Sequence, residues 1–154
     1  MDIKEKQNEM VELLAQNEEK VSVLYETYAG KFPEYEEFWS GLAKEEVGHA
    51  AWIRKLYSNS AVSFNEERFK SKPVEISLKY LDEKIQEAQI QAIDLAGALS
   101  IAIELETNMI ERDFFSVFDG DPDELKETFE NLKTATQGHA ERVRSLWLKK
   151  RKGR

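Results

Sequence analysis

A glutamate and a histidine three residues apart, Glu46 and His49, have a spacing that suits chemistry. On a helix this spacing places a carboxylate and an imidazole side by side on one face. Apolar residues at steps of three and four, such as Phe38, Leu42 and Ile53, indicate that this face is buried. Burying an unpaired carboxylate costs on the order of several kcal/mol, so Glu46 needs a partner. A metal ion is one such partner, and a structural polar pair with a protonated glutamate is the other.

Three more polar residues interrupt apolar helical stripes elsewhere in the chain. They are Glu18, Glu106 and His139. His49 and His139 are the two histidines of the chain, and each lies on a predicted buried stripe. Glu104 competes with Glu106, but it falls on the polar face of its helix. With Glu46 and His49, these residues place carboxylates and imidazoles at matching depth on four helices. Such oxygen and nitrogen donors suit iron or manganese, and a helix-bundle core is a known setting for them.

The elements that must position these residues are long helices separated by glycine and proline. The pattern predicts helices over residues 3–29, 34–57 and 74–90, then from a bend at 91–96 to about 118, and a last helix to about 150. Pro73 is expected at the first position of the third helix, and Asp94 is expected to cap the restart after the bend. Asp121 and Pro122 resemble the cap and first position of the last helix.

One long irregular stretch, residues 58–72, separates the second and third predicted helices, with one helical turn expected at 66–69. In an up-and-down bundle a linker of this length suggests a crossover between distant ends. No strand-like alternation is present. The predicted fold class is all-α, a four-helix bundle whose long crossover contains an extra helical segment.

Composition limits the function classes. With 154 residues, a single domain over 1–154 is expected. The net charge of −8, with both signs mixed, argues against nucleic acid as a partner, and the most apolar region is too polar for a membrane span. The absence of cysteine excludes disulfides and thiolate metal sites. No apolar signal segment begins the sequence, so a cytoplasmic protein is expected. The basic segment 149–154 is interpreted as a cationic helix end that suits the helix dipole.

The chain resembles the ferritin-like superfamily, specifically the rubrerythrin-type diiron domain. The residues that carry the resemblance are Glu18-x-x-Val21-x-x-x-Tyr25-x-x-x-Ala29, Glu45-Glu46-x-x-His49-Ala50-x-x-Ile53, Ala102-Ile103-Glu104-Leu105-Glu106 and His139-x-x-x-Val143. The resemblance implies Glu18 and Glu106 as terminal ligands, Glu46 as a bridging ligand, and His49 and His139 as ligands that cap the two metals. The metal would be iron, dinuclear or partly occupied, or manganese.

The chain departs from this pattern in two respects. The fourth bundle helix should read Glu-x-x-His, but Thr136 occupies the place of the second bridging carboxylate. Gln137 and Glu141 lie two positions from His139 and are expected to point away from the stripe. Rubrerythrins also carry a cysteine-ligated iron domain, which this sequence lacks, so redox chemistry would need an external electron donor.

Three functions remain open from the sequence. The first is a rubrerythrin-like oxidoreductase that reduces peroxide or oxygen, or oxidises Fe(II). The second is a non-catalytic bundle that has lost a complete dimetal site and serves as a binding or structural dimer. The third is a single metal held by Glu18, Glu46, His49 and Glu106. A homodimer is expected in any case, because Trp52 and Tyr80 offer apolar surface and rubrerythrin-like domains commonly pair.

Overall fold

The computed structural model describes residues 3–58, 71–111 and 123–152, and these ranges are almost entirely helical. The elements are α1 (Ile3–Lys31), the short 3-10 helix η1 (Pro33–Tyr35), α2 (Glu36–Ser58), α3 (Ser71–Ile90), α4 (Leu95–Glu111) and α5 (Asp123–Lys152). No strand occurs in the described ranges, which confirms the predicted all-α class. None of the helices described is both long and apolar enough to cross a membrane.

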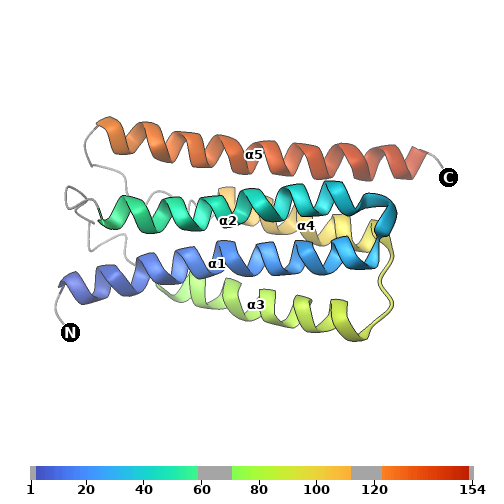
Figure 1. Cartoon of the computed structure of the whole chain (residues 1–154), viewed down its shortest axis with the longest axis horizontal. Helices are drawn as coiled ribbons and strands as arrows, with labels where there is room; N and C mark the ends of the chain where they lie inside the picture. The colour runs from blue at the N-terminus through green and yellow to red at the C-terminus, as the bar shows by residue number, and fades with distance from the viewer. Residues whose placement is uncertain (1–2, 59–70, 112–122, 153–154) are drawn as a thin grey trace.

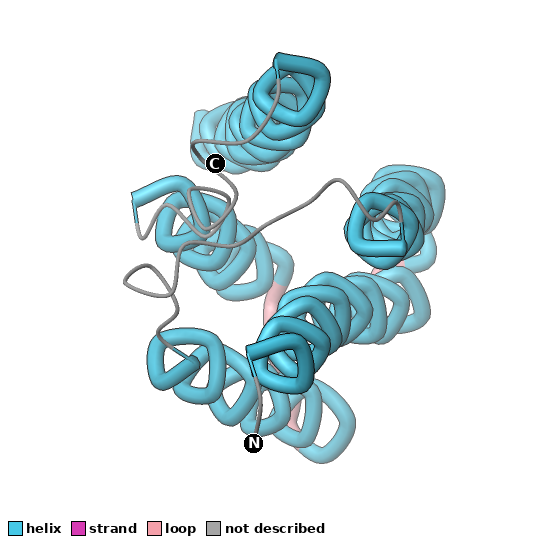
Figure 2. Tube along the Cα trace, turned by 90° about the vertical axis from the view of Figure 1, so that its left-hand side faces the viewer, coloured by secondary structure: helices cyan, strands magenta, loops and turns pink. Residues whose placement is uncertain are grey.

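The helices run lengthwise beside one another, as both views show (Figures 1 and 2). α1 packs mainly against α2 and α3, and α4 packs against α5. α1, α2, α4 and α5 correspond to the four helices of the predicted bundle, and α3, which packs against α1, is the extra helical segment between α2 and α4 in the chain. Figure 1 shows α3 and α5 at opposite edges of the molecule. The predicted four-helix bundle with an additional crossover helix is therefore confirmed.

The core is built by apolar residues that recur at helical spacing on the inner faces. Leu14, Val21 and Leu24 of α1 and Leu42 and Ile53 of α2 are buried. Each large apolar side chain that is fully buried stabilises the fold by about 2 kcal/mol. An aromatic cluster packs between α1 and α2, where the rings of Tyr25, Tyr28 and Phe38 surround Trp39. Trp39 lies wholly inside the core.

The chain breaks between α3 and α4, where the sequence predicts a bend. Asp94 caps α4, because its Oδ1 accepts a hydrogen bond of 2.7 Å from the Gly97 backbone N–H. A Cβ at Gly97 would lie 3.0 Å from that Oδ1 and 3.3 Å from Ile93. A larger residue at this position would therefore crowd the capping carboxylate. Lys31 Nζ donates to the Gln91 carbonyl at 2.9 Å and ties the break to the end of α1.

Helix boundaries differ from the prediction at several places. α1 continues to Lys31, and α2 begins at Glu36 after η1. Pro73 is the third residue of α3, not the first, and it is tolerated because N–H groups in a first turn have no partner within the helix. α5 reaches Lys152, so most of the basic segment is helical. The predicted turn at 66–69, the cap at Asp121 and Pro122, and the stretch 112–118 lie outside the described residues.

Candidate metal centre

Five ionisable residues from four helices meet in the middle of the bundle. Glu18 comes from α1, Glu46 and His49 from α2, Glu106 from α4 and His139 from α5. The three glutamates and His139 are at most 3% exposed, and the side chain of His49 is 12% exposed. The structure therefore brings all five residues named from the sequence to one buried place.

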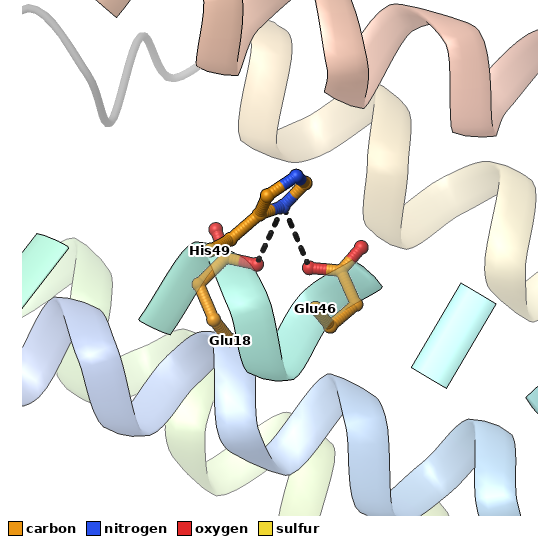
Figure 3. Close-up of side chains that lie close together, drawn as sticks. All are labelled: Glu18, Glu46 and His49. Atoms are coloured by element: carbon orange, nitrogen blue, oxygen red, sulfur yellow. Dashed lines mark ion pairs between the residues drawn. The ribbon is translucent and has the colours of Figure 1, made fainter. Parts of the chain in front are cut away.

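The first group of donors consists of Glu18, Glu46 and His49 (Figure 3). His49 Nδ1 lies 4.0 Å from Glu18 Oε2 and 3.5 Å from Glu46 Oε2. These three atoms are buried and have no hydrogen-bond partner in the described part of the chain. Buried polar atoms are nearly always satisfied in folded proteins, so three unsatisfied atoms that face one another indicate a ligand.

The second group consists of Glu46, Glu106 and His139. His139 Nδ1 lies 2.7 Å from Glu46 Oε1 and 3.5 Å from Glu106 Oε1. Tyr25 donates a hydrogen bond of 2.8 Å from its hydroxyl to Glu106 Oε1. Glu46 belongs to both groups, with Oε2 toward His49 and Oε1 toward His139. A carboxylate placed in this way can bridge two cations.

Burial and neighbouring charges shift the pKa values of the three glutamates in different directions. Desolvation, together with the nearby Glu46 and Glu106 carboxylates, raises the pKa of Glu18 well above its ordinary value. Desolvation and the charge of Glu46 raise the pKa of Glu106 to about 8. Burial alone would raise the pKa of Glu46, but close contacts with Glu18, His139 and His49 outweigh it and hold that pKa well below its ordinary range.

The pKa of His139 is raised, although burial by itself lowers the pKa of an imidazole. Burial alone would lower the pKa of His139, but its contacts with Glu106 and Glu46 raise it to about 10. In the metal-free centre the raised pKa values of Glu18, Glu106 and His139 favour the protonated forms of these groups beside the Glu46 carboxylate. The protons of the metal-free protein occupy the positions that cations would take, since metal ligands must be deprotonated.

Residue 136 is a threonine and contributes no carboxylate to the centre. Thr136 lies one helical turn before His139 and is buried. Gln137 and Glu141 are exposed, as expected from their offset, and neither substitutes for a bridging ligand. Glu104 is exposed on α4 and accepts a hydrogen bond from Tyr80, whereas Glu106 is fully buried. Glu106, and not Glu104, therefore lies on the buried face of α4.

Two residues next to the centre were not singled out from the sequence. Glu45 Oε2 lies 2.9 Å from His139 Nε2, on the outer side of the imidazole, and 2.8 Å from Arg142 Nη1. The sequence analysis named Glu45 only as part of the second-helix motif. Adjacent residues on a helix point in different directions, so Glu45 was not expected on the buried face with Glu46. The i,i+3 spacing of His139 and Arg142 could indicate only that these two residues are neighbours on one helix.

Comparison with known proteins supports the nature of this centre. The model of the rubrerythrin family matches residues 9–147, a span that contains all five residues of the centre. No curated protein and no solved structure gives a significant match.

Proposed function

The chain belongs to the rubrerythrin family of ferritin-like proteins, and on this premise we propose that it is a non-haem iron or manganese protein with redox activity. The proposed reactions are reduction of peroxide or oxygen, or oxidation of Fe(II). The observation that carries the proposal is the set of buried, unsatisfied atoms Glu18 Oε2, Glu46 Oε2 and His49 Nδ1, which converge from two helices.

The donors fit this class of metal. Carboxylate oxygen and imidazole nitrogen are the ligands that iron and manganese accept in bundle cores, and the donor atoms of each group lie within 4.8 Å of one another. Glu18, Glu46 and His49 would hold one ion, and Glu46, Glu106 and His139 would hold a second. When bound, the metal would supply the redox chemistry that passes electrons to the oxidant.

The residues of the chain bind, orient and manage protons around that chemistry. Tyr25 donates its hydroxyl to Glu106 Oε1 and so fixes the direction of this carboxylate. Glu18 and Glu106 are carboxyls of high proton affinity in the metal-free centre, and both would release their protons on binding a metal. Residues 1–154 contain no cysteine to ligate a second iron site, so the proposal assigns the supply of electrons to an external donor.

Unequal occupancy of the two positions is part of the proposal. The first group has three unsatisfied atoms. In the second group Glu106 Oε2 is also unsatisfied, but Tyr25 and His139 already contact the other oxygens, Glu106 Oε1 and Glu46 Oε1. The second bridging carboxylate is absent at Thr136, so less negative charge offsets a second cation. We expect the first ion to bind at Glu18, Glu46 and His49, and the second to bind more weakly. A site with a single ion is the limiting case.

A non-catalytic bundle is the second candidate. The observation that favours it is the threonine at position 136, which removes a ligand from the family pattern. The protein would then keep the helical bundle as a dimeric binding or structural module.

Oxidant consumption separates the two candidates. Protein reconstituted with Fe(II) without oxygen is mixed with hydrogen peroxide or oxygen, and both the oxidant and the absorbance of oxidised iron are followed. We expect consumption by the unchanged protein, and loss of it in Glu46→Gln, which keeps the shape of the side chain but removes the shared charge. Glu104→Gln is the matched control on an exposed glutamate. Iron-loaded protein that consumes neither oxidant would favour the binding module.

A further inference from the structure

The imidazole of His139 contacts carboxylates on both of its nitrogens. Its Nδ1 faces inward, 2.7 Å from Glu46 Oε1, and its Nε2 faces outward, 2.9 Å from Glu45 Oε2. Glu45 and Glu46 are neighbours on α2, so one helix contacts both edges of a ring that belongs to α5. Both contacts fix the direction in which the ring can point.

Glu45 is itself held in place. Arg142 Nη1 donates to the same Oε2 at 2.8 Å, and Arg142 lies three residues after His139 on α5. The side chains of Glu45 and Arg142 are each 47% exposed, whereas that of His139 is 3% exposed. The three residues thus form a row from solvent to the buried centre.

This row matches the arrangement that orients metal-binding histidines. An imidazole that binds a metal through one nitrogen usually donates its other N–H to a carboxylate, which fixes the ring and makes the binding nitrogen more basic. We propose that Glu45 is a positioning residue that accepts the Nε2–H of His139 and so presents Nδ1 to the metal, with Arg142 holding the Glu45 carboxylate. This inference rests on the proposed metal-binding function.

The test compares variants that differ at Glu45. Zn(II) is the probe because it is diamagnetic and binds imidazole and carboxylate donors. Affinity is measured by titration calorimetry on the full chain for the unchanged protein, Glu45→Ala, Glu45→Gln and Glu141→Ala. Glu141 is the matched control, since it is an exposed glutamate two residues from His139.

We expect Glu45→Ala to weaken Zn(II) binding by roughly 10- to 100-fold, the usual effect of removing such a partner. Glu45→Gln should recover part of the loss, because the amide oxygen still accepts a hydrogen bond. Glu141→Ala should change affinity by less than about threefold, since an exposed charge acts weakly on the site.

A spectroscopic signature distinguishes positioning from general stability. In Zn(II)-loaded protein the Nε2 proton of His139 should give a slowly exchanging downfield resonance, which Glu45→Ala should shift or remove. The chain has two histidines, so comparison with His49→Gln assigns it. An unchanged resonance in Glu45→Ala, or equal losses of affinity in Glu45→Ala and Glu141→Ala, would overturn the role of Glu45 alone. Failure of the unchanged protein to bind Zn(II) would overturn the proposed function as well.

Discussion

At the scale of single residues, the centre is a set of carboxyls and imidazoles that the sequence marks by their misplacement. Glu18, Glu106 and His139 could be found because each interrupts an apolar stripe, and the spacing of Glu46 and His49 gave the pair. The outer contact of Glu45 with His139 could not be found in this way. It depends on the distance between two helices, and no periodicity within one helix encodes that distance.

The stability of the metal-free protein should fall as pH rises from about 5 to about 10. The pKa of Glu106 rises from 4.5 to about 8 on folding, and that of His139 from 6.5 to about 10. A group with a raised pKa in the folded state contributes fully below its unfolded pKa, and this contribution is lost as pH rises through the folded pKa. The lowered pKa of Glu46 gives a contribution that stays constant over this window.

Urea unfolding of metal-free protein at pH 5, 7 and 9 measures this effect. We expect a loss on the order of a few kcal/mol in the free energy of unfolding across the series. Saturating Mn(II) should reduce or reverse the fall, because the metal competes with protons for the same atoms. A free energy that stays flat or rises with pH in the metal-free protein would contradict the assigned protonation states.

A carboxylate at position 136 should convert the centre toward a complete dimetal site. Thr136→Glu would restore Glu-x-x-His on the inner face of α5, one turn before His139. Without metal the variant should be less stable, because another carboxylate joins three in a low-dielectric core. With Fe(II) or Mn(II) it should gain more stability than the unchanged protein gains.

Thermal unfolding with and without metal checks this prediction. Thr134→Glu is the control, since residue 134 is exposed on the same helix. If Thr136→Glu behaves like Thr134→Glu in both conditions, residue 136 does not face the metal cavity.

At the scale of elements, the break between α3 and α4 lets α4 enter the bundle separately from α3. The sequence predicted this bend because Asp94 precedes a new apolar stripe and can cap it. The start of α3 was less accurate, because a proline is compatible with any place in a first turn and so does not fix the first residue. The apolar periodicity of the sequence predicted that each helix exists. It did not predict the exact first and last residues, which depend on local hydrogen bonds.

Removing the cap at Asp94 should destabilise the protein by about 1 kcal/mol, because the Gly97 N–H would lose its acceptor. Asp94→Asn should retain most of the stability, since an amide oxygen also caps. Asp82→Ala, which removes an exposed ion pair with Lys20, is the control and should cost less. Chemical unfolding monitored by circular dichroism gives the values. Equal losses for Asp94→Ala and Asp82→Ala would show that the cap adds nothing.

At the scale of the whole molecule, the bundle could be predicted because its four main helices share one pattern. Each has a buried apolar face that is interrupted near its middle by a glutamate or a histidine. The sequence could not tell which helices pack as pairs. α1 packs mainly with α2 and α3, and α4 packs with α5, so the centre joins the two parts of the bundle. Binding a metal there should therefore stabilise the bundle as a unit.

The homodimer stays a prediction. Val47 on α2 and Ile76 on α3 are each 52% exposed, which leaves apolar surface for a second copy. Trp52 and Tyr80, which prompted the prediction, are partly buried against the core and offer less surface than expected. Light scattering at micromolar concentration should give twice the chain mass of 17.9 kDa. A monomer mass would contradict the prediction.

The metal content of the reconstituted protein tests the central claim most directly. Metal-free protein is incubated with Fe(II) without oxygen or with Mn(II), freed of loosely bound ions, and analysed for metal per chain. We predict about one ion with a partial second for the unchanged protein and for the control Glu104→Gln, and close to none for Glu46→Gln, because both groups share Glu46. Unchanged protein without bound metal, or equal metal content in Glu46→Gln, would contradict a buried metal centre.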